Sequence, residues 1–513
     1  MTGSKSIGMA ALVVSVGVLL SRVLGYVRTL ILAGMLGVGA DTDLYAAAFT
    51  VPDILFFLMA GGYLTITLVP LLAGHVQSGD RRAAGEVFTA VFRVVLGIMV
   101  VLTVILIAAA HPITAAVFPE ITDDDLDRLV AMMRVTFASQ VFFMAGTMFM
   151  AAQYAHRRFV IPTLAPLIYN VGIISGGLVG GWAGDPSPES FIWGGFVGAA
   201  VGNFAIQMWG AKRSGVWFTG GTPLWSPALP QYFALAFPLM IGQSAVALDE
   251  SWPRLFGQFA GESAISELYF ARTLNMLPVG VIAQAAGVAA YPFLAGLVAE
   301  GNMDQFRATV VRSVRAAIAV GGLAAGLVVA LAVPITGTAF EYGRFDADDT
   351  LAVGELLTIF AITIPFWAAH QVYTRAFYAQ RRMWTPVIIG TVVTVAVVPI
   401  LWVGVNRLGA PGVALGSTIG LVAYTLAIAI SWHRSEPGGG GPVLAVAVKT
   451  LSASVAAGLA AFGVAVLLEG SPSVVRGAVA APAGVVVYLL AGRLLGLQEV
   501  TAVIRRLRRS DPA

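Results

Sequence analysis

The sequence contains no cysteine and few charged residues. The absence of cysteine excludes disulfides, thiolate metal sites and a cysteine nucleophile. The five histidines are scattered without metal-ligand spacing, and a formal charge of +3 is too small to indicate a nucleic-acid partner. Only 11% of the 513 residues are charged, less than half the roughly 25% of a soluble domain. With 58% hydrophobic residues and a mean hydropathy of +0.85, the chain is predicted to be an integral membrane protein.

Apolar runs of about 20 residues, bounded by charges, proline or glycine clusters, recur along the whole chain. Hydrocarbon offers the backbone no hydrogen-bond partner, so runs of this length form helices. We therefore predict an all-α, polytopic membrane protein with about 14 transmembrane helices. The predicted spans are 7–33, 43–74, 86–110, 129–152, 160–182, 191–210, 228–259, 264–297, 308–333, 351–379, 385–404, 411–432, 443–467 and 473–495.

The distribution of lysine and arginine predicts the orientation. If the N-terminus is cytoplasmic, 17 of the 30 basic residues fall in inside segments. Four fall outside, namely Arg128, Arg344, Arg407 and Arg476. This bias predicts both termini inside, which requires an even number of spans. The first apolar run shows no cleavage site, so we expect no signal peptide.

Two unrelated motifs recur at one spacing. Tyr154 to Pro162 and Tyr378 to Pro386 share the pattern Y-A-x-R-R-x-x-x-P at an offset of 378 − 154 = 224. The motif that begins at Asp43 recurs at Glu267, again 224 residues later. We predict a duplication into two pseudo-symmetric six-helix lobes, an N-lobe at 1–215 and a C-lobe at 225–435, inserted the same way up. Facing lobes suit alternating access, whereas a static helical scaffold does not explain the repeat.

Two further spans follow the repeat, within 443–497, beyond a glycine-rich linker. A substrate with a long lipid tail could use this C-terminal helix pair as a groove. The alternative is a lipid-facing or oligomerising hairpin. The basic tail at 498–513 is expected to lie on the cytoplasmic side and to bind anionic lipid headgroups.

Charged residues within the spans are candidate site residues, because each costs about 2.5 to 3.5 kcal/mol to insert at mid-bilayer. The predicted substrate-binding residues are arginines, because guanidinium pairs with phosphate oxygens through two hydrogen bonds. The predicted gating or ion-coupling residues are acids. The arginines are Arg22, Arg28, Arg254 and Arg272, and the acids are Asp43, Asp249 and Glu250.

Glu250 and Arg254 lie four residues apart, on one helical face. They are expected to form either part of the site or a buried ion pair that fixes helix register. No ATP-binding loop or hydrolase motif is present, so we predict a transporter without cofactor, metal or catalytic residues. An ion gradient, membrane potential or substrate gradient would then supply the energy.

The segment Ser21 to Arg28 reads S-R-V-L-G-Y-V-R, and Gly37 to Asp43 reads G-V-G-A-D-T-D. This start closely resembles the MurJ (MviN) family of lipid II flippases, within the multidrug, oligosaccharidyl-lipid and polysaccharide exporter superfamily. The likeness extends over essentially the whole chain, through Val69 to Ala73, Arg158 to Pro162, Phe340 to Phe345 and Phe377 to Ala379.

The resemblance implies a two-lobed flippase that moves undecaprenyl-pyrophosphate-linked peptidoglycan precursor to the outer leaflet by alternating access. It implies that Arg22 and Arg28 hold the pyrophosphate and that Asp43 helps to gate the cavity. Implied partners are lipid II or a related polyprenyl-pyrophosphate glycolipid, membrane lipids and cell-wall synthesis enzymes.

The sequence departs from the family pattern at several charged positions. Phe56, Phe57 and Gly61 stand where the family usually has a basic pair and an acid, and Thr273 stands where it has an arginine. Alternative functions therefore stay open. These are export of another polyprenyl-linked oligosaccharide, antiport of small molecules or cations within the same superfamily, and a non-transporting role in docking cell-wall enzymes.

Overall fold

The structure is a computed structural model that describes residues 3–59, 64–121, 123–184, 186–287, 291–437 and 440–501. The side chains at 3–13, 64–66, 123, 238–239, 241–249, 283–287 and 292 lie outside this description. Every regular element in the described ranges is a helix, which confirms the predicted all-helical class.

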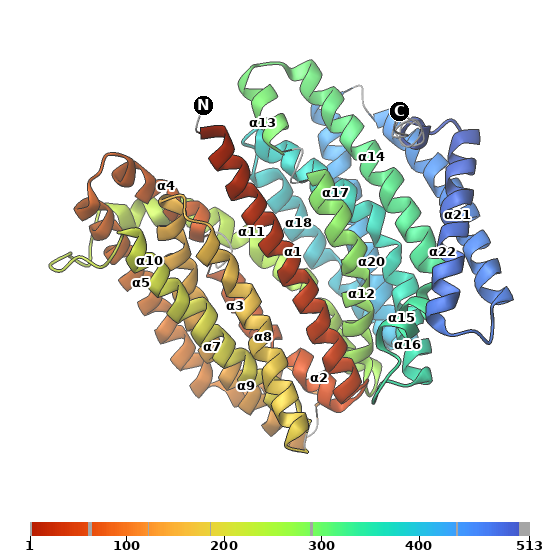
Figure 1. Ribbon diagram of the computed structural model, residues 1–513, viewed down its shortest axis with the longest axis horizontal. Helices are drawn as coiled ribbons and strands as arrows, with labels where there is room; N and C mark the ends of the chain where they lie inside the picture. The colour runs from red at the N-terminus through yellow and green to blue at the C-terminus, as the bar shows by residue number, and fades with distance from the viewer. Residues whose placement is uncertain are drawn as a thin grey trace. The chain divides into compact units, whose positions relative to one another are not determined.

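The chain divides into two compact units, Met1–Gln258 and Phe259–Ala513. Each unit is a bundle of long helices (Figure 1). Unit 1 contains α1 (Gly3–Leu36), α2 (Ala40–Ala47), α3 (Thr50–Leu58), α4 (Leu64–Gln77), α5 (Arg81–Ala108), α6 (Ala110–Val117), α7 (Asp123–Ala155), α8 (Val160–Trp182), α9 (Pro188–Gly198), the π-helix η1 (Ala199–Ala205), α10 (Ile206–Ser214) and α11 (Ala228–Gly257).

Unit 2 follows a short 3-10 helix, η2 (Gln258–Ala260), and ends with the C-terminal helix pair. Its helices are α12 (Ala264–Gly287), α13 (Tyr291–Ala299), α14 (Met303–Ala330), α15 (Ala332–Phe340), α16 (Ala347–Ala361), α17 (Thr363–Ala379), α18 (Trp384–Ala396), α19 (Val398–Leu408), α20 (Ala410–Ser435), α21 (Gly440–Leu467) and α22 (Ser473–Leu494).

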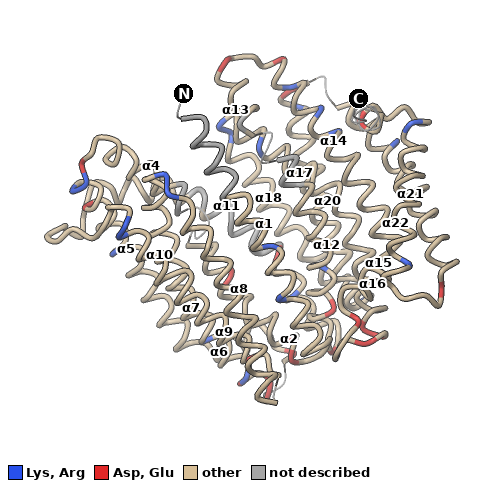
Figure 2. The backbone as a smooth tube through the Cα atoms, viewed as in Figure 1, with Lys and Arg blue, Asp and Glu red and all other residues tan. Residues whose placement is uncertain are grey.

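Charged residues gather toward the ends of the helices in each unit, and the helix middles are mostly uncharged (Figure 2). Within the described residues, ten helices are long and apolar enough to cross a membrane, or eleven if the bent pair α16 and α17 forms one span. These spans support a multi-pass membrane protein. The other three predicted spans fall on the short helices α2 to α4, on α11, and on α12 with α13. The count of 14 stays a prediction.

The repeated motifs adopt the same backbone conformation in both halves of the chain. Arg157 and Arg381 follow α7 and α17, respectively, with left-handed φ angles of 56° and 60°. The N–H groups of Arg158 and Arg382 donate to the carbonyls of residues 153 and 377, both at 2.9 Å. Each helix therefore ends in the same hydrogen-bonded reversal, and the next helix begins at Val160 or Trp384.

Helix α11 packs against α3, α4 and α5 and groups with unit 1. The predicted repeat instead assigns α11 to the C-lobe, as its first helix. The lobe boundary at 215–225 therefore remains a prediction about the evolutionary repeat, while the compact unit extends to Gln258.

The C-terminal helix pair packs closely on α14. A Cβ on Gly326 would lie 2.6 Å from the Ser454 carbonyl oxygen, so the backbones of α14 and α21 are in contact there. Arg315 of α14 pairs with Glu499 at 2.8 Å, and Tyr488 of α22 donates a hydrogen bond to the Ala319 carbonyl. The pair is thus an integral part of unit 2, and the tail groove stays a prediction.

Candidate functional site

Two charged residues within unit 1 form an ion pair between α3 and α11. Arg254 Nη1 lies 3.4 Å from Asp53 Oδ2, and the Arg254 side chain is 19% exposed. Asp53 lies in the first turn of α3 and Arg254 in the last turn of α11. A helix N-terminus favours an acid and a C-terminus favours a base, so both helix dipoles favour these positions.

Arg28 of α1 belongs to the same neighbourhood. Its Nη1 donates a hydrogen bond to Asn170 Oδ1 of α8 at 3.3 Å. The amide nitrogen of Asn170 in turn donates to the Pro166 carbonyl, one turn earlier in α8, at 2.9 Å. Arg28, Arg254 and Glu250 all interact electrostatically with the Asp53 carboxylate. Unit 1 therefore brings together two predicted arginines, one predicted acid and Asp53.

The expected pair of Glu250 with Arg254 does not form. Arg254 pairs with Asp53, and Glu250 is exposed, with no hydrogen bond or ion pair in the described part of the chain. The four-residue spacing is favourable, but Asp53 on the packed neighbouring helix takes the guanidinium instead. Asp53 was missed as a site residue, although an acid inside a membrane span is itself a signal.

Three of the remaining predicted site residues lie on α1, α2 and α12. Arg22 is exposed on α1, and Asp43 lies in the first turn of α2. Arg272 lies on α12 of unit 2 and is partly buried. The side chain of Asp249 lies outside the described residues, so its predicted role stays a prediction.

A cavity of about 330 Å³ opens beside the ion pair, entirely within unit 1. Asp53 and Glu250 both contribute to its wall, as do Phe56 and Phe57, two of the positions that depart from the family pattern. Of the other departures, Gly61 lies outside the described residues, and the Thr273 hydroxyl donates to the Tyr269 carbonyl of its own helix.

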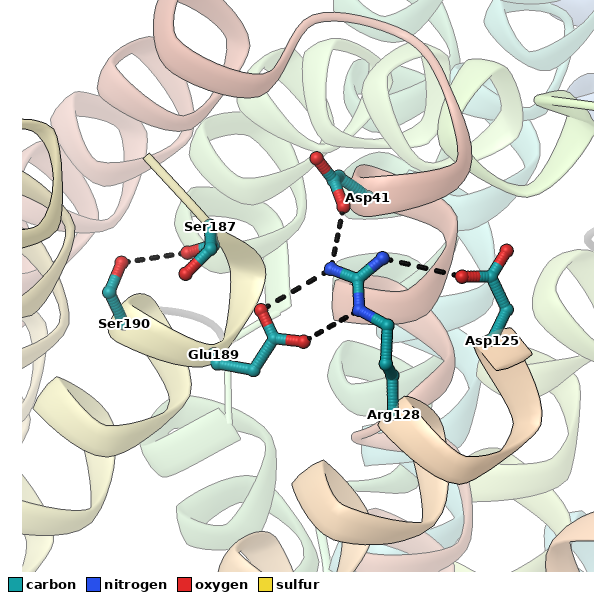
Figure 3. Close-up of polar contacts among 6 residues, drawn as sticks. All are labelled: Asp41, Asp125, Arg128, Ser187, Glu189 and Ser190. Carbon is teal, nitrogen blue, oxygen red and sulfur yellow. Dashed lines mark hydrogen bonds and ion pairs between the residues drawn. The ribbon is translucent and has the colours of Figure 1, made fainter. Parts of the chain in front are cut away.

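A second charged cluster of unit 1 is centred on Arg128, a residue predicted to face outside, and Figure 3 shows its contacts. Arg128 of α7 donates to Asp41 at 2.8 Å, to Asp125 at 3.3 Å, and to both carboxylate oxygens of Glu189 at 2.9 and 3.4 Å. One guanidinium thus connects the starts of α2, α7 and α9. From the sequence, Arg128 was predicted only to lie in an outside segment. Its partners Asp41 and Glu189 were not predictable, because they lie 87 and 61 residues away in the chain.

In unit 2, Glu436 follows α20 and accepts hydrogen bonds from Arg307 and Gln380. Partial burial of the carboxylate opposes its ionisation. The bonds from Arg307 and Gln380, with the charges of Arg307 and Arg382, outweigh that cost and lower the pKa of Glu436. This network joins the start of α14 to the ends of α17 and α20.

A family model described as lipid II flippase MurJ matches residues 32–476. The chain belongs to the MurJ lipid II flippase family. The lipid II flippase MurJ of Burkholderia cenocepacia is 26% identical over 431 residues, which is 83% of each chain. A probable lipid II flippase MurJ of Thermotoga maritima is 24% identical over 503 residues, covering 96% of this chain and 97% of the relative.

Solved structures share the fold. A lipid II flippase MurJ in an inward closed conformation superposes with a TM-score of 0.78 at 18% identity, covering 94% of this chain and 98% of that chain. An inward-facing multidrug resistance MATE transporter of the MOP superfamily gives a TM-score of 0.66 at 15% identity, covering 83% and 95%. MurJ family members and these structural neighbours are transporters, so the fold is that of a transporter rather than an enzyme.

Proposed function

We propose that this protein is a lipid II flippase, which moves the undecaprenyl-pyrophosphate-linked peptidoglycan precursor to the outer leaflet of the bacterial cytoplasmic membrane. The observation that carries the proposal is the match of the MurJ family model over residues 32–476. The relatives named lipid II flippases and the shared fold support it.

Arg28 and Arg254 are the proposed substrate-binding arginines of unit 1, with Arg22 and Arg272 as further candidates. A guanidinium binds phosphate oxygens bidentately, which suits a pyrophosphate. Asp43, Asp249, Glu250 and Asp53 are the proposed gating or coupling acids, since a carboxylate that holds an arginine in one state can release it to substrate in another. Alternating access between the repeat-derived lobes requires no ATP, and an ion gradient or membrane potential supplies the energy in this proposal.

We further propose the orientation of the termini, the helices that contact the lipid tail, and the partner enzymes. The excess of basic residues in alternate loops supports both termini on the cytoplasmic side. The C-terminal pair α21 and α22 is proposed to contact the polyprenyl tail. Cell-wall synthesis enzymes are natural partners, because they produce and consume a lipid-linked precursor.

The test is complementation of a strain depleted of its own flippase. We expect the wild-type protein to restore growth and Arg28→Ala to abolish rescue at equal membrane abundance. Losing one charge-assisted interaction with phosphate costs about 1.5 to 3 kcal/mol, or roughly 10- to 100-fold in substrate affinity.

Arg82→Ala is the matched control, because Arg82 is a highly exposed arginine paired with Glu86 at the start of α5. It should rescue as well as the wild type. Undiminished rescue by Arg28→Ala would remove this arginine from the mechanism. Failure of the abundant wild-type protein to rescue would contradict the assignment of lipid II as substrate.

A further inference from the structure

The cavity of unit 1 has an acidic wall. Among the described residues, Asp53 and Glu250 are its charged lining residues, and no described lysine, arginine or histidine lines it. Arg254 pairs with Asp53 at 3.4 Å, and Glu250 makes no hydrogen bond or ion pair in the described part of the chain. A carboxylate in the cavity wall that has no direct partner attracts a cation.

Aromatic rings form much of the remaining wall. Phe143 lies between Phe56 and Tyr169, with ring centroids 5.9 and 5.0 Å apart, and Phe57 packs edge-on against Phe56 at 6.1 Å. Phe49 and Phe196 also line the cavity. Aromatic faces attract organic cations through their quadrupoles.

Gln140 provides an independent indication of a ligand. Its side chain is only 4% exposed, it lines the cavity, and it has no hydrogen-bond partner among the described residues. Both amide atoms remain accessible from the cavity, so a bound group can form hydrogen bonds with them.

The neighbouring hydroxyl groups supply acceptors rather than donors. Thr136 donates to the Ala48 carbonyl at 2.9 Å, and Ser139 donates to the Val135 carbonyl at 3.0 Å. With these protons already used, the hydroxyl oxygens can only accept from a ligand. A carboxylate, a carboxamide and two hydroxyl oxygens together suit a group that carries several N–H donors.

A bare metal ion fits this arrangement poorly. Calcium and magnesium take six or more oxygen ligands, and sites for them are rich in carboxylates. No group of three or more His, Cys, Asp or Glu residues in the described ranges could hold a metal ion. A volume of about 330 Å³ is also much larger than an ion requires.

We propose that this cavity binds a primary organic ammonium group, with Glu250 as the counter-ion, Gln140 as a hydrogen-bond partner and the phenylalanine rings as cation–π contacts. The ammonium group is either an amine on the head group of the transported lipid or a separate small organic cation. The binding chemistry is the same in both cases, and the site does not depend on the proposed flippase function.

The test measures binding of phenethylammonium to the purified full-length protein by isothermal titration calorimetry. Phenethyl alcohol, a neutral analogue of similar shape, serves as the comparison ligand. We expect saturable binding of the amine, at least about tenfold weaker binding of the alcohol, and a similar loss for the amine in Glu250→Gln.

Glu262→Gln is the control, because Glu262 is an exposed acid in unit 2, outside the cavity. It should bind the amine like the wild type. Gln140→Leu removes the carboxamide from a different helix and should weaken binding several-fold, so the proposal remains testable if one variant fails to fold. Equal affinities for amine and alcohol, no saturable binding by the wild type, or equal losses in Glu250→Gln and Glu262→Gln would overturn the proposal.

A second measurement identifies the source of the ammonium group. The wild type is titrated with lipid-linked substrate whose head-group amine is either free or N-acetylated. If the head group supplies the cation, acetylation weakens binding to the wild type but not to Glu250→Gln. If a separate cation is the ligand, acetylation has no effect and phenethylammonium still binds. A wild type that binds phenethylammonium but neither lipid would contradict the flippase proposal and leave the cation site in place.

Discussion

Arg157 and Arg381 hold a backbone conformation that arginine seldom adopts. Both have positive φ angles, of 56° and 60°, immediately after a long helix. A left-handed conformation costs a non-glycine residue roughly 1 to 2 kcal/mol. The same cost therefore recurs at equivalent positions of the repeat, and both arginines are exposed to solvent.

Glycine at either position should stabilise the protein. Arg157→Gly and Arg381→Gly relieve the strain, partly offset by the greater freedom of glycine in the unfolded chain, so each should raise the free energy of unfolding by up to about 1 kcal/mol. Thermal unfolding in detergent measures the effect. Arg158→Gly, next in the chain and without a positive φ, should not stabilise, and stabilisation there comparable to Arg157→Gly would contradict the strain argument.

At the residue scale, candidate site residues could be predicted from the sequence, but their interaction partners could not. Arg28 and Arg254 could be singled out from the sequence, because an arginine in an apolar run is costly at mid-bilayer. Their partners Asn170 and Asp53 could not, because they lie 142 and 201 residues away and depend on helix packing. Of the two alternatives left open for Glu250 and Arg254, the ion pair between them does not form, because Arg254 pairs with Asp53.

At the scale of elements, Arg128 connects three helices of unit 1 through four hydrogen bonds. Asp41 belongs to the Gly37 to Asp43 motif, in which the Thr42 hydroxyl also donates to the Gly37 carbonyl at 2.7 Å. The motif thus fixes the turn from α1 to α2, and Arg128 holds that turn against α7 and α9.

Arg128→Ala should therefore weaken unit 1 more than removal of an ordinary surface charge. Arg128 and its three partners are about one-third exposed, so solvent screens each pair, and the network as a whole contributes about 1 to 2 kcal/mol. The check is thermal unfolding of Arg128→Ala, Arg128→Lys and Arg82→Ala. Lysine should restore only part of the loss, because it lacks the planar fork, and Arg82→Ala should change stability by less than about 0.5 kcal/mol. Equal effects of Arg128→Ala and Arg82→Ala would show that the Arg128 network stabilises the protein no more than an exposed ion pair does.

For the molecule as a whole, the sequence predicted the helical class and the repeat, because both depend on patterns within the chain. The offset of 224 that relates the two Y-A-x-R-R motifs also relates the helix ends at Ala155 and Ala379 and the helix starts at Val160 and Trp384. The break between α2 and α3 was not predictable, because hydropathy runs across it without interruption. The grouping of α11 with unit 1 likewise depends on packing rather than on local pattern.

The absence of cysteine makes the topology directly testable, because each introduced cysteine is the only thiol in the protein. A six-span repeat places equivalent positions on the same side of the membrane, whereas an odd number of spans per repeat would place them on opposite sides. Ser78 and Glu300 are exposed positions of the two halves predicted to face the cytoplasm, and Glu120 and Arg344 are exposed positions predicted to face outside. In intact cells, a membrane-impermeant maleimide should label Glu120→Cys and Arg344→Cys at once, and should label Ser78→Cys and Glu300→Cys only after permeabilisation. Labelling of one member of either pair without the other would refute the parallel duplication, and reversal of both pairs would refute the cytoplasmic placement of the termini.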